Sequence, residues 1–159
     1  MMTRAHTWTR KGVLVPVITA VIASIVLALA PSLRQPSAFE TAQKLIFSVP
    51  LAEFIATADD PHHDARFDWD SDKCSAPLFG SAGKTYDFSL ACRRHDFAYR
   101  NLSRLDGGKR WTAALRARVD DRFMSDMRAD CAARPTVQRP ACRAWARLYF
   151  SAVRQFAGP

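Results

Sequence analysis

The 159-residue sequence lacks several features that would assign it to a common structural class. It has no internal repeat and no low-complexity tract, which excludes solenoids and other repeat architectures. It also has no CxxC pair, the spacing common in structural zinc sites, and no EF-hand spacing of acidic residues. The length is sufficient for one domain plus whatever the N-terminus adds.

Acidic side chains are absent from the first 30 residues. Three basic residues there precede an uncharged apolar run over residues 13–30, which ends in Ala-Leu-Ala, the small-x-small form of a cleavage site. The run of 18 residues is long for a signal core and just long enough to span a bilayer, and Pro31 would follow the cut. We expect residues 1–30 to be an export signal, with an uncleaved membrane anchor as the alternative. Either form predicts a secreted or extracellular domain.

Charge is distributed unevenly along the chain, whose formal net charge is +8. Residues 31–92 hold 5 basic and 9 acidic side chains, whereas residues 93–159 hold 15 basic and 6 acidic ones. A basic half favours encounter with anionic material, such as a phospholipid surface, nucleic acid or a polyanionic envelope. A solvated, Arg-rich helix surface accounts for at least half of these residues equally well. The charge therefore defines a class of partners and names none.

Four cysteines fit an exported domain, because an even count in a small secreted chain is typical of disulfides. Three pairings are possible. The pairing of Cys74 with Cys92 and of Cys131 with Cys142 is favoured, because each bond would tie a loop to an adjacent helix. A zinc site is the competing interpretation, and the missing CxxC pair argues against it.

Apolar spacing predicts an all-α domain over residues 41–159, preceded by a Pro/Ser-rich linker at 31–40. Residues 59–83 have little periodicity and are expected to form a loop. The expected helices are 41–58, interrupted at Pro50, then 87–104, 112–133, and a last helix from Pro140. A short connection makes the helices over 87–104 and 112–133 antiparallel neighbours.

Two titratable residues lie on the apolar faces of these neighbouring helices. At about 100° per residue, His95 lies in the middle of the apolar face of one helix, and Asp120 lies within the apolar arc of the other. A core-facing aspartate is rare unless it is paired. We therefore expect Asp120 to accept a hydrogen bond from one ring nitrogen of His95, leaving the other nitrogen as a base. The alternatives are a satisfied core histidine, and a carboxylate bonded to backbone, Arg116 or Tyr99.

Asp96 points about 100° away from His95, to the flank of the same helix. The segment FDWDSDKC, residues 67–74, offers several carboxylates and backbone carbonyls. A Cys74–Cys92 bond would hold this acidic loop within one turn of Asp96. Hard oxygen ligands from a helix and an irregular loop suit calcium, and a solvated acidic loop is the alternative.

The string CRRHDFAYRN, Cys92 to Asn101, resembles the catalytic-helix motif of secreted phospholipases A2 of bacteria and fungi. Residues 67–74 look like the calcium loop of that family, residues 118–131 like its second catalytic helix, and residues 141–153 like its last helix. The resemblance covers about residues 40–157. Ala98 stands where the family usually has glycine, and the stretch between the first two cysteines matches loosely.

The resemblance implies a small disulfide-bonded helical domain that hydrolyses the sn-2 ester of glycerophospholipids at a membrane or micelle surface. His95 would be the general base for water, and Asp120 would orient and support the imidazolium. Tyr99 would support the pair by packing and hydrogen bonding.

The same resemblance implies that the reaction depends on Ca²⁺. The metal ligands would be the side chains of Asp72 and Asp96 and the backbone carbonyl of Lys73. The family also implies cystines at the two pairs of cysteines favoured above.

Other functions are less compatible with the sequence. A non-catalytic secreted basic protein that binds anionic membranes or polyanions would share the scaffold, but it has no reason to bury His95 with Asp120. A nuclease lacks a second His or Lys placed for phosphoryl transfer and an aromatic stacking platform, so no nucleic-acid partner is expected. His62 and His63 sit in a Pro-flanked loop without a third ligand at a fixed spacing, which disfavours a zinc or copper site. Nothing indicates a stable oligomer, so a monomer is expected.

Overall fold

The computed structural model describes residues 35–72, 74 and 86–156. All regular structure in these ranges is helical, which confirms the expected all-α fold. The chain divides between Gln35 and Pro36, and the unit from Pro36 onward holds every described helix. The predicted signal or anchor at residues 1–30 lies outside the described residues. Among the residues that are described, no helix is long and apolar enough to cross a membrane.

The first two helices are short because proline separates them. Helix α2, Ala38–Phe47, begins inside the predicted linker, where Ser37 and Glu40 form a capping box that satisfies backbone N–H groups of the first turn. Pro50 takes the N-cap position of α3, Leu51–Asp59, where a missing N–H costs nothing. The helical segment expected over residues 41–58 with an interruption at Pro50 is therefore present as two separate helices.

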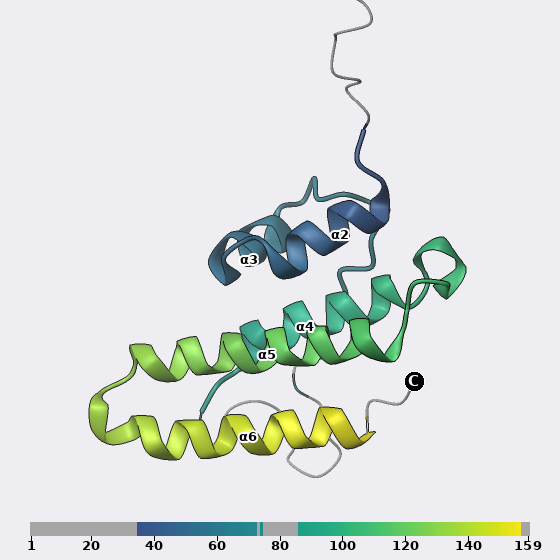
Figure 1. Cartoon of the computed structure of the whole chain (residues 1–159). Coiled ribbons are helices and arrows are strands. Elements are labelled where there is room, and N and C mark those ends of the chain that lie inside the picture. The colour runs from purple at the N-terminus through teal and green to yellow at the C-terminus, as the bar shows by residue number, and fades with distance from the viewer. Residues whose placement is uncertain (1–34, 73, 75–85, 157–159) are drawn as a thin grey trace, which may run out of the picture. The chain divides into compact units, whose positions relative to one another are not determined.

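Three longer helices form the rest of the fold: α4 (Ser89–Leu102), α5 (Ala113–Ala133) and α6 (Arg139–Phe156). Their ends lie within about two residues of the predicted ones. Figure 1 shows α5 running back along α4, and α6 returning along α5. The α4–α5 connection reverses direction through η1, Leu105–Gly108, which includes left-handed residues, and Thr112 then caps α5 by accepting a hydrogen bond from the Leu115 N–H.

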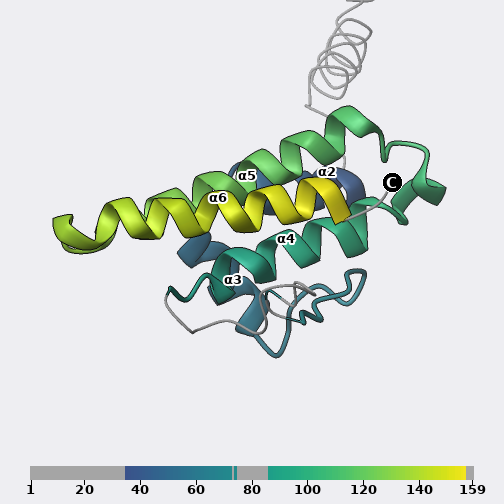
Figure 2. The same ribbon diagram turned by 90° about the horizontal axis from the view of Figure 1, so that it is seen from below.

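The apolar core has two parts. One lies where α2 and α3 pack on α4 and the start of α5, and includes the buried rings of Phe54, Phe67 and Phe97. The other lies between α4, α5 and α6, and includes Phe123, Tyr149 and all four cysteines. Figure 2, seen from below, shows α4, α5 and α6 gathered around this second part.

The disulfide pairing favoured from the sequence is confirmed. Cys74 bonds to Cys92 with Cα atoms 5.3 Å apart, and Cys131 bonds to Cys142 with Cα atoms 5.6 Å apart. The second bond joins the end of α5 to the start of α6 across their short connection. The first joins the acidic loop to α4, so it positions a segment that has no regular structure of its own.

A charged pair is buried between α4 and α5. The side chain of Arg94 is 1% exposed, and its Nε donates to Oδ2 of Asp126 at 2.9 Å while its Nη1 donates to the Val49 carbonyl at 2.8 Å. Arg122 approaches the same carboxylate with its Nε 3.3 Å from Oδ1. Burial lowers the pKa of Arg94, and Asp126 opposes that shift. The pair links the backbone before α3 to the helices that carry His95 and Asp120.

Removing one partner of this pair is expected to destabilise the fold strongly. Asp126→Ala leaves the buried Arg94 charge without its carboxylate, which costs about 3–5 kcal/mol in the free energy of unfolding by urea. The matched control is Asp121→Ala on the same helix, where the carboxylate is 63% exposed and paired with Arg154, so the cost should stay under about 1 kcal/mol. Equal losses in the two variants would contradict the assignment.

Candidate active site

His95 and Asp120 meet between α4 and α5. Nε2 of His95 lies 3.0 Å from Oδ1 of Asp120, and their side chains are 8% and 0% exposed. The imidazole ring packs between Tyr99 and Phe123, with ring centroids 4.5 and 4.7 Å away. Because a carboxylate accepts, Nε2 carries the proton and Nδ1 carries the lone pair. In the part of the chain that the structure describes, no group bonds to that Nδ1.

Asp120 has further partners from two helices, Tyr99 of α4 and Arg154 of α6. The Tyr99 hydroxyl donates to the same Oδ1 at 2.8 Å and accepts from Nε of Arg116 at 3.1 Å. Burial and the neighbouring carboxylate raise the pKa of Tyr99, so the phenol stays protonated and keeps donating. Nε of Arg154 lies 3.6 Å from Oδ2, too far for a hydrogen bond but close enough to offset charge. From the sequence, a bond between Asp120 and Tyr99 was an alternative to a bond between Asp120 and His95. In the structure both residues bond to the same atom, Oδ1 of Asp120.

Asp96 lies on the flank of α4, where the acidic loop reaches it. The Ser71 hydroxyl donates to its Oδ2 at 2.6 Å. Burial is the main cause that raises the pKa of Asp96, the adjacent Asp72 carboxylate raises it further, and the Ser71 hydrogen bond opposes both. Two carboxylates that repel each other beside a hydroxyl are hard oxygen donors, so these residues fit a divalent cation such as calcium. Lys73, the third predicted ligand, lies outside the described residues.

The acidic loop is held against α4 by rings and by one amide. The rings of Phe67 and Trp69 pack on Phe97 with centroids 5.4 and 4.6 Å apart. Nδ2 of the buried Asn101 donates to the Asp68 carbonyl at 2.8 Å, and its Oδ1 accepts from the Asp68 N–H at 2.9 Å. The Asn101 side chain of α4 therefore satisfies both the N–H and the carbonyl group of Asp68.

At its other end the loop turns through an unusual backbone conformation. Cys74 has a φ of 50°, in the left-handed region that costs a non-glycine residue about 1 kcal/mol. Its bond to Cys92, one turn before Asp96, holds the residue there. The loop is thus fixed to α4 at two points, Asn101 and Cys92, on either side of the two aspartates.

Several of these residues were missed from the sequence. Asn101 belongs to the quoted motif, and its place four residues after the core residue Phe97 was a signal, since a buried amide needs partners. Ser71 and Arg154 carried no signal, because their contacts join segments far apart in the chain. Arg94 looked like one more surface arginine.

Two other groups of titratable residues in the described ranges do not form a metal site. The His63 ring packs on Trp69 at 5.0 Å, and within the described ranges no group of potential metal ligands includes His62 or His63. Asp130 lies near the sulfurs of Cys131 and Cys142, but these form a disulfide and have no thiolate to offer a metal.

The chain is also similar in sequence to known proteins. Residues 42–157 match the sequence model of a family described as prokaryotic phospholipase A2. A secretory phospholipase A2 of Arthroderma benhamiae is 35% identical over 115 residues, which cover 70% of this chain and 74% of that protein. A secretory phospholipase A2 of Beauveria bassiana is 31% identical over 125 residues, covering 79% of this chain and 61% of that protein.

Proposed function

Since the chain belongs to the prokaryotic phospholipase A2 family and is a hydrolase of that type, we propose that it hydrolyses the sn-2 ester of glycerophospholipids with water activated by His95. The products are a fatty acid and a lysophospholipid. The observation that carries this proposal is the 3.0 Å contact between Nε2 of His95 and Oδ1 of the buried Asp120. That contact supports a basic Nδ1, and no nucleophilic serine is required.

The proposed reaction uses His95 twice. Nδ1 takes a proton from a water molecule as its oxygen attacks the ester carbonyl, and the imidazolium later returns the proton to the departing lysophospholipid alkoxide. Asp120 holds the ring through Nε2 and stabilises the imidazolium charge. The Tyr99 hydroxyl also bonds to the Asp120 carboxylate, and the Arg154 guanidinium lies 3.6 Å from its other oxygen.

We further propose that the reaction depends on calcium, held by the side chains of Asp72 and Asp96 together with the Lys73 carbonyl. When bound, the ion supplies positive charge for the substrate phosphate and the developing oxyanion. The support is that Asp72 and the partly buried Asp96 are neighbouring carboxylates: burial is the main cause that raises the pKa of Asp96, and the charge of Asp72 raises it further.

Release of fatty acid from vesicles labelled at the sn-2 chain tests this function. With calcium present we expect labelled fatty acid and unlabelled lysophospholipid, and with a calcium chelator we expect the rate to fall to background. Release of the sn-1 chain would contradict the positional assignment. Full activity in chelator would contradict the metal requirement.

As the pH is lowered, calcium affinity is expected to begin to fall at a higher pH than it would at a site built from ordinary aspartates. The folded-state pKa of Asp96 is raised, so the carboxyl takes up a proton earlier as pH falls, and metal binding must release that proton. Calcium titrations at decreasing pH would show proton release growing as affinity declines. An affinity independent of pH throughout the acidic range would contradict the assignment of Asp96 as a ligand.

We infer that the enzyme acts outside the cytoplasm on phospholipid membranes or micelles. The word secretory in the names of both relatives and the two disulfides support this location. A membrane-anchored fraction, a monomeric state and the lack of a nucleic-acid partner stay predictions.

A further inference from the structure

Helix α6 carries four arginines and no acidic residue over Arg139–Phe156. Two of them, Arg143 and Arg147, are one turn apart and face α5, where Arg128 lies opposite. These three side chains line one hollow of about 350 Å³ between the helices.

Nothing in the described part of the chain neutralises this trio. None of the three guanidinium groups forms a hydrogen bond, an ion pair or a ring contact there. The carboxylates of α5 are already engaged, because Asp126 pairs with Arg94, Asp130 with Arg134 at 2.8 Å, and Asp121 with Arg154 at 3.0 Å. Three like charges around one hollow repel one another, and an anion with several oxygens would relieve that repulsion.

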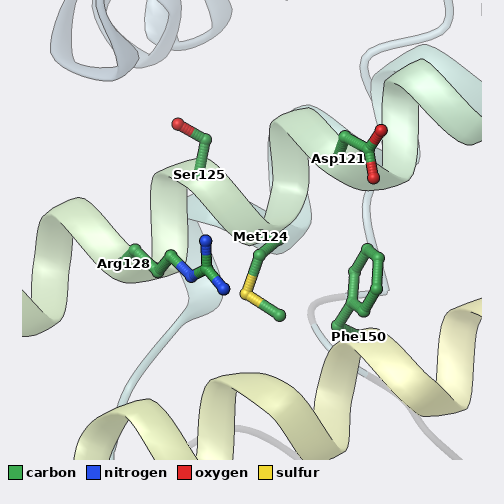
Figure 3. A pocket seen from close by; sticks show the side chains of 5 residues that line it. All are labelled: Asp121, Met124, Ser125, Arg128 and Phe150. Carbon is green, nitrogen blue, oxygen red and sulfur yellow. The ribbon is translucent and has the colours of Figure 1, made fainter.

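A second hollow of about 330 Å³ adjoins the first and shares Arg128 with it. Figure 3 shows Met124 of α5 and Phe150 of α6 facing the space between the two helices, with the Arg128 guanidinium beside Met124. We call the two hollows together the α5–α6 groove. Its arginine end matches a phosphate. Its other end is mixed: Met124 and Phe150 match adjoining hydrocarbon, and Asp121 and Ser125 are the polar lining residues there.

The arginine end of the groove lies apart from the candidate active site, whereas the other end adjoins it through Asp121, whose partner Arg154 also approaches Asp120. Asp121 and Arg128 point about 80–100° round α5 from Asp120, which faces His95. The groove variants below therefore leave every residue placed in the catalytic and metal sites unchanged.

We propose that the α5–α6 groove docks the protein on anionic phospholipid surfaces. The arginine end takes a lipid phosphate, and Met124 and Phe150 take the adjoining apolar part of the lipid. This inference rests on the proposed function in naming a lipid as the occupant. Free phosphate would use the arginines alone, without the apolar stretch, and a nucleic acid would find no row of stacking rings in the groove.

Vesicle binding in chelator, where no hydrolysis is expected, tests the groove separately from catalysis. The exported protein is mixed with phosphatidylcholine vesicles that contain or lack phosphatidylglycerol, and the bound fraction is measured by sedimentation. The groove variant is Arg143→Gln with Arg147→Gln. The charge-matched control is Lys44→Gln with Lys109→Gln, two exposed lysines elsewhere on the domain. Arg143→Lys with Arg147→Lys keeps the charge, and thermal unfolding checks each fold.

The groove variant should bind anionic vesicles about 30-fold more weakly than wild type, while the control and the lysine variant stay within about threefold. The single change Arg128→Gln should weaken binding about fivefold. This variant replaces the double variant as the test if the double variant does not fold. The proposal would be overturned if the groove variant and the control lost the same affinity, or if wild type bound both vesicle types equally. It would also be overturned if inorganic phosphate, at the concentration of lipid phosphate, released wild type from the vesicles. Wild type that binds through the groove but releases no fatty acid in calcium would contradict the proposed function alone.

Discussion

Replacing His95 with glutamine is expected to lower kcat for phospholipid hydrolysis by about 10³-fold or more, with KM nearly unchanged. Glutamine keeps much of the volume and can still donate to Asp120, but it has no basic nitrogen where Nδ1 stands. The fold should persist, because the ring contacts of His95 contribute less than the surrounding core. Initial rates on mixed micelles, together with thermal unfolding, measure both effects.

His62→Gln is the matched control for this substitution. That side chain is exposed and lies in a separate loop, so its loss should change kcat by less than about twofold. A His95→Gln enzyme that keeps more than a tenth of wild-type kcat would show that another group accepts the proton. Asp120→Asn supplies a second test, because it keeps the shape of the carboxylate and removes its charge.

Replacing Asp96 with asparagine is expected to raise the calcium Kd by about 100-fold. The amide keeps one oxygen but has no negative charge to attract the cation. It also has no acidic proton that competes with the metal. Since the carboxyl is partly buried beside Asp72, the variant should also be as stable as wild type or more so without calcium. Calcium titrations followed by heat release and by hydrolysis rate give the two affinities independently.

Asp70→Asn is the control for the metal site. Asp70 belongs to the same acidic loop and is exposed, and its N–H bonds to Asp68 within the loop. The calcium affinity of the Asp70→Asn variant should stay within about threefold of that of wild type. Similar losses at both positions would point to general attraction by an acidic loop and would remove Asp96 from the ligand set.

The helical framework could be predicted because it depends on local rules. Periodic apolar residues, Pro50 and the cap at Thr112 act within a turn or two of their own positions, so the helices follow from neighbouring residues. The contact of His95 with Asp120 was also predictable, because each is a titratable residue on an otherwise apolar helix face. Two such exceptions on neighbouring helices have one economical solution.

The support around that contact could not be predicted in the same way. Arg154 reaches Asp120 from α6, and its approach depends on how two helices lie against each other. Ser71 reaches Asp96 only because the loop bends back onto α4. Arg94 reads as a solvated charge until α5 places Asp126 opposite it. Such contacts are set by packing between distant segments, and residue spacing alone carries no information about them.

The bond between Cys74 and Cys92 has a consequence for when the enzyme becomes competent. It closes the acidic loop onto α4 and holds Cys74 in a conformation that the residue avoids when free. In a reducing compartment that covalent tie is absent, and only the non-covalent contacts of Ser71, Asn101 and the rings hold the loop against α4. We therefore expect the proposed calcium ligands Asp72 and Asp96 to be fully positioned only after this bond has formed in an oxidising compartment.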